Sequence, residues 1–439
     1  MIRSSRRSNA ITNKIKTYST LYSVEEVNGE VPSNPSLQPM RIVENGVTGS
    51  AEEITSDIVL PETRIPSTPE VGTESNAGDI QTEWNIDEQD AWFAGVFGSN
   101  WYTVNAGKKT LTLGGVDANH PVASHSFSLY EKFPQTPVAW QHYKKEFINS
   151  LSMDFATDSF VKLTWNFMGS NNPQMTDTID VTGTPTFLDA SKTKSFITKA
   201  DMWLKVGDTK ETLEALRQSP SMNISINNNL EKTLALGEDE AIENSLGDFV
   251  VEGSMDVYNV DDKGKALYND AVAGKDKVIQ VSVSRKVNGT TTRYTLTLNV
   301  HFGAPSKSKN GNKLQFSIPF KVNDSKDLML EKETVVVDAQ TPTFTYSIAN
   351  AEYEVDASSV TALNGTATVT DGGSVTYQWY TVSGSTETEI EDATSATYTP
   401  DVSSAGTTKY KVIATNTNSS ATTTQTATAS QTCTITVTA

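Results

Sequence analysis

The sequence predicts a mainly β protein, with a duplicated β-sandwich or barrel module of α+β character at its centre and an all-β domain after it. Three observations predict this class. Apolar and polar residues alternate over short central runs such as IQTEWNI (80–86), the same order of strand and helix signals occurs twice, and the chain becomes rich in Thr, Ser and Ala from about residue 343. Alternation with a period of two is typical of strands that bury one face.

The division of the chain into domains follows from its length and texture. A chain of 439 residues is too long for one ordinary hydrophobic core. Pro, Asn, Ser and Glu dominate the start, which predicts an extended, flexible arm with basic residues near its beginning. The predicted parts are an N-terminal arm, a first module, a linker, a second module and a C-terminal domain, over residues 1–59, 60–170, 171–200, 201–340 and 343–439.

The first module begins with a predicted strand that Gly78 and Asp79 open. Asp87 then has the residue type of a helix cap, and the run EQDAWFAGVFG predicts a short amphipathic helix. A helix of this length is not stable alone in water, so we expect it to be held by its apolar face. Burial of each large side chain stabilises the fold by about 1.5–3 kcal/mol. The expected core residues of this module are Trp92, Phe93 and Phe97 on the helix and Trp165 on the closing strand.

The second module repeats these signals in the same order. Gly247 and Asp248 open a strand, FVVEGSMDVYNV, whose first residue, Phe249, is the expected core residue. Asp261 and Asp262 then precede a second short helix. Aligning the two halves gives offsets of 169 residues for the opening strands and 151 residues for the closing strands. Drifting offsets with a constant order favour two copies of one module with loops of different length. A coincidence of common β patterns remains the alternative.

The run GGSVTYQWY (372–380) resembles a strand of bacterial and phage immunoglobulin-like domains. In those domains a core Trp packs beneath a later strand that carries Tyr-x-Cys or Tyr-x-aliphatic. Trp379 and Tyr410 occupy these two positions, with Val412 in place of the Cys. The resemblance implies an all-β immunoglobulin-like sandwich over residues 343–439. Such a domain serves either as an outward-facing decoration or spacer, or as a weak binder of cell-surface glycans.

Residues 60–325 resemble the tail tube proteins of siphophages. Residues 221–274 carry a strand that ends in an Asn-rich turn (227–229), a loop, a strand of the form F-x-V-x-G-S (249–254) and a helix. Residues 148–169 match the family's element of a strand, a short polar turn and a strand that ends in F-x-G. A tube core followed by an immunoglobulin-like domain is a recurring arrangement in this family.

This resemblance implies a structural virion protein, the major tail tube subunit of a phage with a non-contractile tail. Subunits of this family close into rings whose inner sheets join edge to edge. The rings stack around a tape-measure protein, and genomic DNA later passes through the lumen. Two modules per chain favour a trimeric ring with pseudo-hexameric symmetry, and a single module would instead require a hexameric ring. The net charge of −18 is compatible with a lumen that does not hold DNA.

The sequence carries no pattern typical of an enzyme or of a cofactor site. The four histidines form no H-E-x-x-H, and the single cysteine, Cys433, excludes an internal disulfide. Residues 259–270 faintly resemble a calcium loop, but Lys263 occupies a ligand position, so a helix cap is favoured. We therefore expect no catalytic, cofactor-binding or metal-ligating residues.

Expectations about localisation follow from the absence of a secretory signal or an apolar span. We expect assembly in the host cytoplasm, a final place in the virion tail and no membrane insertion. The alternative function is a phage tail or cell-surface adhesin that binds carbohydrate through the immunoglobulin-like domain.

Overall fold

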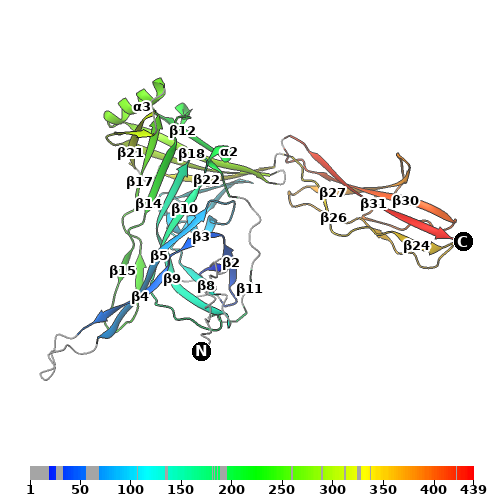
Figure 1. The fold of residues 1–439 in the computed structure, drawn as a ribbon, viewed down its shortest axis with the longest axis horizontal. Helices are drawn as coiled ribbons and strands as arrows, with labels where there is room; N and C mark the ends of the chain where they lie inside the picture. The colour runs from blue at the N-terminus through cyan, green and yellow to red at the C-terminus, as the bar shows by residue number, and fades with distance from the viewer. Residues whose placement is uncertain are drawn as a thin grey trace, which may run out of the picture. The chain divides into compact units, whose positions relative to one another are not determined.

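The protein is described by a computed structural model, in which the chain divides into two compact units built mainly from β-strands (Figure 1). Unit 1 contains residues 1–104, 109–283 and 295–331, and unit 2 contains residues 105–108, 284–294 and 332–439. The structure describes residues 19–25, 33–55, 69–105, 107–133, 137–179, 181, 183–184, 186–187, 195–258, 261–287, 290–310, 313–323, 328–336, 338–421 and 423–439.

The centre of unit 1 is one antiparallel sheet with the strand order β5–β10–β9–β14–β17–β21. On its outer borders, β3 and β4 pair with β5, and β20 pairs with β21. Successive residues of a strand point to opposite faces, so every second side chain is buried. The strands are β3 (Ile42–Asn45), β4 (Thr48–Ile54), β5 (Glu70–Glu83), β9 (Ala139–Ala156), β10 (Lys162–Gly169), β14 (Ser221–Asn227), β17 (Val250–Tyr258), β20 (Ser306–Asn310) and β21 (Lys313–Val322).

Further strands extend both halves of this sheet. In the first half, the beginning of β9 pairs with β8, and β1 lies between β8 and β2. In the second half, β12 pairs with β18, and side-chain hydrogen bonds link β18 to β19. The strands are β1 (Ser19–Val24), β2 (Ser36–Met40), β8 (Phe127–Phe133), β11 (Thr186–Phe187), β12 (Met202–Gly207), β13 (Glu214–Ala215), β15 (Glu231–Thr233) and β16 (Glu243–Ser245). Residues of both units occur in five strands, which are β6 (Tyr102–Asn105), β7 (Lys108–Thr112), β18 (Asp276–Val287), β19 (Thr290–Phe302) and β22 (Met329–Val336).

Helix α1 (Asp90–Phe97) is buried on all sides instead of being amphipathic. Trp92 contacts Trp165 and Phe167 of β10 on one side and Tyr22 of β1 on the other. The sequence-based cap is wrong, because Asp87 has a φ of 67° and Gln89 occupies the cap position without a side-chain bond to the helix. With no solvent-facing side, α1 lies inside the core and does not cover an edge.

Helix α3 (Asp262–Val272) begins where the sequence predicts. The Asp261 carboxylate accepts a hydrogen bond of 3.0 Å from the backbone N–H of Gly264, which confirms the predicted cap. Tyr268 packs on Phe316 of β21, so this helix is held on the second half of the sheet by an aromatic contact. Two shorter helical turns are α2 (Thr198–Asp201) and the 3-10 turn η1 (Lys210–Thr212).

The two halves of the central sheet repeat the same order of elements and the same pairings. The pairing of β5 with β10 corresponds to that of β17 with β21, and in these ladders Ile80 lies opposite Trp165 as Met255 lies opposite Ile318. Equivalent residues are therefore 175 positions apart in the first strands (255 minus 80) and 153 apart in the last (318 minus 165). The sequence-based offsets of 169 and 151 are therefore wrong by six and two residues. Both errors are even because an alternating pattern identifies which face is buried and does not fix the register.

The residues before position 60 are more than an arm. Among the described residues, β1 pairs with β2 and β8, and β3 and β4 pair with β5. Leu21, Leu37 and Val47 are buried. The expected linker also contributes to the core, since Phe196 is fully buried and its backbone bonds to Trp84 and Val161. Short apolar runs between polar residues hid both segments from the sequence analysis. The basic residues predicted to form a flexible arm precede residue 19 and lie outside the described residues.

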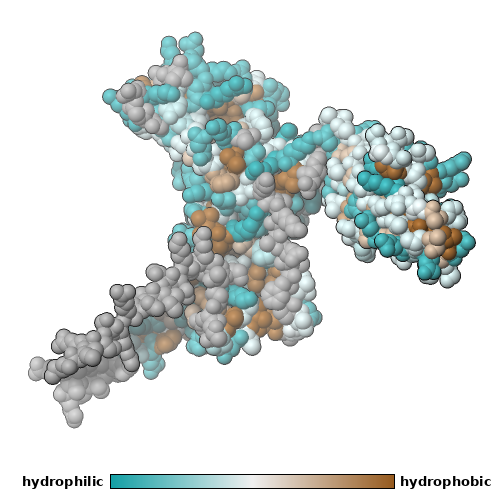
Figure 2. All heavy atoms as spheres, turned by 45° about the vertical axis from the view of Figure 1, so that its right-hand side comes forward, coloured by the Kyte–Doolittle hydropathy of each residue, from teal (hydrophilic) through white to brown (hydrophobic). Residues whose placement is uncertain are grey.

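Most of unit 2 is a β-sandwich over residues 343–439. A five-stranded sheet has the order β24–β31–β30–β27–β28, with β24 parallel to β31, and the strand pairs β23–β26 and β25–β29 pack against the same core. Its surface is pale in Figure 2, as expected for a face rich in Thr and Ser. The strands are β23 (Thr343–Phe344), β24 (Ala351–Glu354), β25 (Leu363–Asn364), β26 (Ala367–Thr368), β27 (Ser374–Ser383), β28 (Thr386–Glu389), β29 (Thr397–Tyr398), β30 (Gly406–Thr417) and β31 (Thr426–Thr438).

Candidate assembly surface

One face of the central sheet is lined by small polar and acidic side chains, and we call it the polar face. It arises from the residues that alternate with the buried ones along the six strands β5, β10, β9, β14, β17 and β21. Five carboxylates and three lysines give it a net charge of −2. Its polar residues are Asp79, Gln81, Glu83, Ser150, Ser152, Asp154, Lys162, Thr164, Asn166, Ser221, Asn223, Ser225, Asn227, Glu252, Ser254, Asp256, Tyr258, Lys313, Ser317 and Lys321.

Hydrogen bonds between neighbouring strands tie these side chains to one another. Asn166 Nδ2 donates to Asp79 Oδ1 over 2.7 Å, and Asn223 Nδ2 donates to Asp154 Oδ1 over 2.7 Å. Ser221 Oγ donates to Asp256 Oδ2 over 2.6 Å. Charge-assisted bonds of this kind hold short side chains flat along the sheet. The polar face therefore offers an ordered, acidic surface without arginines, and its aromatic side chain, Tyr258, lies at the end of β17 beneath Lys313.

An aromatic cluster supports this face from behind. The rings of Trp92 and Trp165 are 5.4 Å apart, and those of Phe93 and Trp165 are 5.1 Å apart. The indole N–H of Trp165 donates to Thr82 Oγ1 over 3.0 Å, so the buried polar atom has a partner. Trp92, Phe93, Phe97 and Trp165 are each at most 1% exposed.

Phe249 is the sequence-predicted core residue that the structure places elsewhere. It precedes β17 and is half-buried, and the alternation of β17 instead buries Val251, Met255 and Val257. The two aromatic residues Trp84 and Phe196, which the sequence analysis did not select, are fully buried and contact each other. Phe196 lies in a polar segment, so no pattern in the sequence marked it.

In unit 2, Trp379 and Tyr410 lie together in one core, as the sequence analysis expected of them. Trp379 is fully buried, faces Val412 across the β27–β30 ladder and donates from Nε1 to the backbone oxygen of Ser395 over 2.9 Å. Tyr410 is 4% exposed, and the ring of Tyr398 lies against both side chains. Cys433 is buried in the same core as a free thiol.

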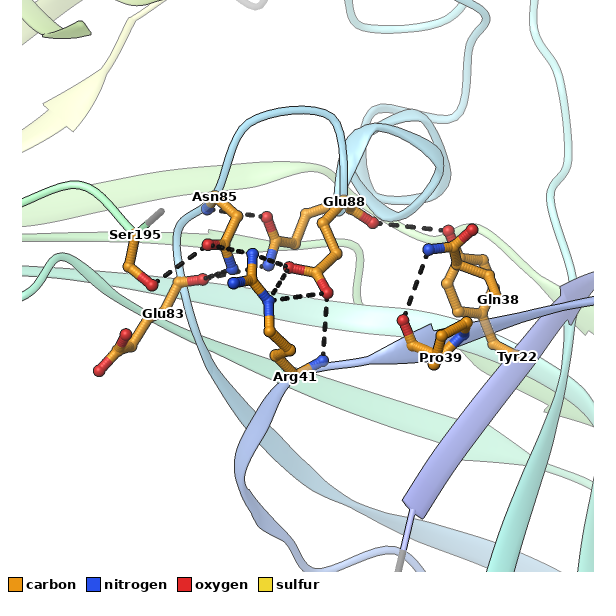
Figure 3. A network of polar contacts seen from close by, with 9 residues as sticks. Tyr22, Gln38, Pro39, Arg41, Glu83, Asn85, Glu88 and Ser195 are labelled. Carbon is orange, nitrogen blue, oxygen red and sulfur yellow. Dashed lines mark hydrogen bonds and ion pairs between the residues drawn. The ribbon is translucent and has the colours of Figure 1, made fainter. Parts of the chain in front are cut away.

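An ion pair between the partly exposed Arg41 and the buried Glu88 anchors the start of β3 to the turn before α1 (Figure 3). Arg41 Nη2 lies 2.9 Å from Glu88 Oε2 and 2.7 Å from Asn85 Oδ1, and the Glu88 side chain is fully buried. Ser195 Oγ donates to the same Asn85 oxygen over 3.1 Å. Removing Arg41 would leave the buried Glu88 carboxylate without its cationic partner, which is destabilising. Three segments distant in sequence therefore meet at this network.

Buried carboxyl groups lie around β8 and β9. Glu25 accepts hydrogen bonds from Ser128 Oγ over 2.9 Å and from the Lys145 backbone N–H over 3.1 Å. Burial raises the pKa of Glu131 to about 7, and burial also raises the pKa of Glu146 well above its ordinary value. These groups stand inside unit 1 and away from the polar face.

Both borders of the central sheet are open among the described residues. Neither β4 nor β20 has a described strand on its outer side, so each presents unpaired backbone N–H and C=O groups. The border formed by β3 and β4 carries Glu44, Glu52 and Glu53, all exposed, and no lysine or arginine. The border formed by β20 carries exposed Lys307 and Lys309 and no acidic residue. The end of unit 1 that carries α3 is largely hydrophilic (Figure 2).

Within the described part of the chain, no group of three or more His, Cys, Asp or Glu side chains could hold a metal ion. No helix among the described residues is long and apolar enough to cross a membrane. The arrangement offers a surface and two sheet borders, and it suits assembly.

Comparison with known proteins adds one match. A model of the family described as "Phage tail tube protein" matches residues 18–323, which is more than half of the chain. No curated protein matches the chain.

Proposed function

The chain belongs to the phage tail tube protein family, and on that premise we propose that its copies close into rings that stack into the hollow tail through which genomic DNA is delivered. The protein is accordingly a structural protein of a bacteriophage virion tail, and we assign it no catalytic role. We propose assembly in the host cytoplasm around a tape-measure protein.

The observation that carries this proposal is a central sheet with one buried face, one polar face and two open borders. A soluble monomer with two long open borders risks uncontrolled aggregation, and closing the sheet into a barrel removes both borders. Repeated contacts between different borders of identical copies generate a closed ring when the rotation closes. The polar face would then line the inside, since the opposite face is covered by α1 and the second layer of strands.

The size of the closed sheet favours three chains per ring over six. Each chain offers eight strand positions, counting the six central strands and one border position on each side. Three chains make 24 strands, and with strands about 4.8 Å apart and tilted by about 40° the backbone diameter is about 48 Å. Duplex DNA, whose two grooves are each about 8 Å deep, is roughly 20 Å across and fits inside this diameter. Six chains would give a ring about twice as wide, far beyond what one duplex needs.

The chemistry of the polar face suits a DNA conduit. Contacts between phosphates and cations dominate the affinity of proteins for DNA. A lumen with a net charge of −2 per chain and with its side chains bonded to one another would repel the phosphates and leave few free donors. DNA would therefore slide without being held.

Stacking of rings would use the hairpin of β4 and β5, which continues beyond the end of β10. Its exposed apolar residues, Ile54 at 59% and Val71 at 74%, are unusual on a surface otherwise rich in Glu. We assign the hairpin to contacts with the adjacent ring. The sandwich of residues 343–439 would serve as an immunoglobulin-like decoration domain, because its core is complete without residues from unit 1.

Electron microscopy of the purified protein tests the proposal. The expected result is rings or hollow tubes with three peripheral densities per ring, one for each C-terminal sandwich. Six densities per ring would contradict the trimer and leave the tube intact. A protein that stays a single folded particle at high concentration would contradict the tube itself.

A further inference from the structure

Strand β9 of the first half pairs with β14 of the second half, and we call this pairing the internal joint. It offers a template for the contact between neighbouring copies. We propose that β20 of one copy pairs antiparallel with the β3–β4 border of the next copy, with Ser306 opposite Thr48. This proposal rests on the proposed ring, and it adds the two strands, their direction and their register. The argument uses the repeat and the ladders of unit 1.

The first step equates β14 with the β3–β4 border. Both precede the first strand of their half and pair antiparallel with it. Asn45 lies opposite Ile80, and Met222 lies opposite Met255, the residue equivalent to Ile80. Continuing along each ladder, Thr48 lies opposite Ala77 and its counterpart Ser225 lies opposite Glu252. The two positions also share a face, because both belong to the side of the sheet that carries the polar residues.

The second step compares the second part of β9 with its counterpart in the other half, which consists of the end of β19 followed by β20. Both pair antiparallel with the last strand of their half. Each ladder also contains the same irregularity, in which one strand advances four residues while its partner advances three. These positions are 148–152 against 164–167 in the first half and 302–306 against 317–320 in the second. A bulge at the same place in both ladders makes Ser306 the counterpart of Ser152.

The third step transfers the internal joint to the outer borders. Inside the chain, β9 pairs antiparallel with β14, and Ser152 lies opposite Ser225. Replacing each residue by its counterpart places Ser306 of one copy opposite Thr48 of the next, and Lys309 opposite Asn45. The direction is also consistent, because every pairing between β5 and β20 is antiparallel, so β20 and β4 run in opposite directions around a ring. Six joints of one kind, three internal and three external, would then close the barrel.

Charge explains why these borders pair with each other and not with themselves. The β20 border carries Lys307 and Lys309, and the β3–β4 border carries Glu44, Glu52 and Glu53. Two copies of β20 would place lysines side by side, and two copies of β4 would place glutamates side by side, which is destabilising. Only the head-to-tail pairing joins a basic border to an acidic one. In the proposed register Lys309 lies opposite Asn45, next to Glu44, and Glu52 and Glu53 lie beyond the Ser306 end of β20. This contact joins two different surfaces, and such contacts build rings instead of dimers.

Cysteine cross-linking of the full chain tests the register. The variant T48C/S306C should form disulfides between chains in assembled rings, giving covalent dimers and trimers on a non-reducing denaturing gel. The internal variant S152C/S225C is the positive control and should cross-link within one chain at monomer mass. The matched negative control T48C/K307C places its thiols on opposite faces, and its interchain product should be at least tenfold lower.

The outcomes separate this proposal from the proposed function. Tubes in which S152C/S225C cross-links and T48C/S306C does not would overturn the register and leave the ring standing. An unmodified protein that never forms rings would overturn both. Should the double-cysteine chain not assemble, the charge-reversed variant K307E/K309E gives a second test. It should fold but lose ring formation, and its assembly at an unchanged level would contradict the charge argument.

Discussion

Single side chains in this protein have roles that depend on which face of a strand they occupy. Trp165 and Asn166 are neighbours in β10, yet Trp165 is buried against Trp92 and Asn166 bonds Asp79 on the polar face. Alternation along a strand predicts this separation from the sequence. It cannot predict the state of a carboxyl group such as Glu131, whose surroundings come from β1, β3 and β9.

Glu131 makes the unassembled protein less stable as the pH rises. Burial raises the pKa of this carboxyl to about 7 in the folded protein, from an ordinary value of 4.5. Between these values the folded protein binds a proton that the unfolded chain has lost, so the free energy of unfolding falls as the pH rises through this interval. Glu131→Gln should therefore raise the free energy of unfolding at pH 8 by about 1–2 kcal/mol and change it little at pH 4.5. The melting temperature at the two pH values measures this difference.

The control for this prediction is Glu53→Gln, which replaces an exposed glutamate on β4. This substitution changes no buried site, so it should not raise the melting temperature at pH 8. An E131Q variant with an equal effect at pH 4.5 and pH 8 would show that burial of this carboxyl has no cost.

Gly78 and Gly253 are equivalent positions of the two halves, and each lies where backbone approaches closely. A Cβ atom would come within 2.2 Å of the Gly46 carbonyl oxygen at Gly78 and within 2.3 Å of the Asn223 carbonyl oxygen at Gly253. Gly78→Ala and Gly253→Ala should each lower the free energy of unfolding by about 1–3 kcal/mol, measured by denaturant titration. Gly72→Ala on the same strand as Gly78 is the control, because its Cβ would meet side-chain atoms and no backbone, namely Ile54 at 3.0 Å and the Cβ of Glu52 at 3.4 Å. Equal losses at positions 72 and 78 would refute the steric argument.

The two helices show how far local signals determine an element. Both occur where the sequence predicts them, but they are stabilised differently. A side-chain cap begins α3, whereas α1 has no side-chain cap and is surrounded by buried aromatic residues. Local patterns predicted the cap at Asp261 because Asp before a helix accepts its free N–H groups. The same pattern misled at Asp87, because tertiary packing there sets the backbone conformation.

Removal of the α3 cap should weaken unit 1. Asp261→Ala should lower the free energy of unfolding by about 1 kcal/mol, because the N–H of Gly264 loses its acceptor. Asp262→Ala, one residue later and within the first turn, is the matched control and should cost less, about 0.3–0.5 kcal/mol. Chemical denaturation of both variants measures the difference. A larger loss for D262A would contradict the assigned cap.

The arrangement of the whole molecule separates assembly from decoration. The core of the C-terminal sandwich consists of residues between 344 and 437, and the polar face and both open borders of the sheet belong to unit 1. Assembly should therefore depend on unit 1 alone.

Deletion of residues 343–439 tests this separation. The truncated chain should still form hollow tubes of the same diameter in electron micrographs, without the peripheral densities. A matched full-length variant, Trp379→Ala, should lose about 3–5 kcal/mol of stability in the sandwich and keep the tubes. Loss of tubes in both variants would show that the sandwich takes part in ring closure.

The sequence was sufficient to predict the features that depend on neighbours in the chain. These include the mainly β class, the buried and exposed faces of strands such as β10, the repeat, the helix at Asp261 and the family. Alternation and capping are local physical effects, so they leave a pattern that can be read without a structure.

Tertiary structure decided the register of the repeat, the place of residues 19–54 and Phe196 in the core, and the half-buried position of Phe249. It also brought Arg41, Glu88 and Asn85 together and gathered acidic and basic residues on opposite borders of one sheet. Pairing between strands distant in sequence sets all of these, and a shift of two residues along a strand leaves the alternating pattern unchanged. For that reason only the paired strands could show where one copy would meet the next.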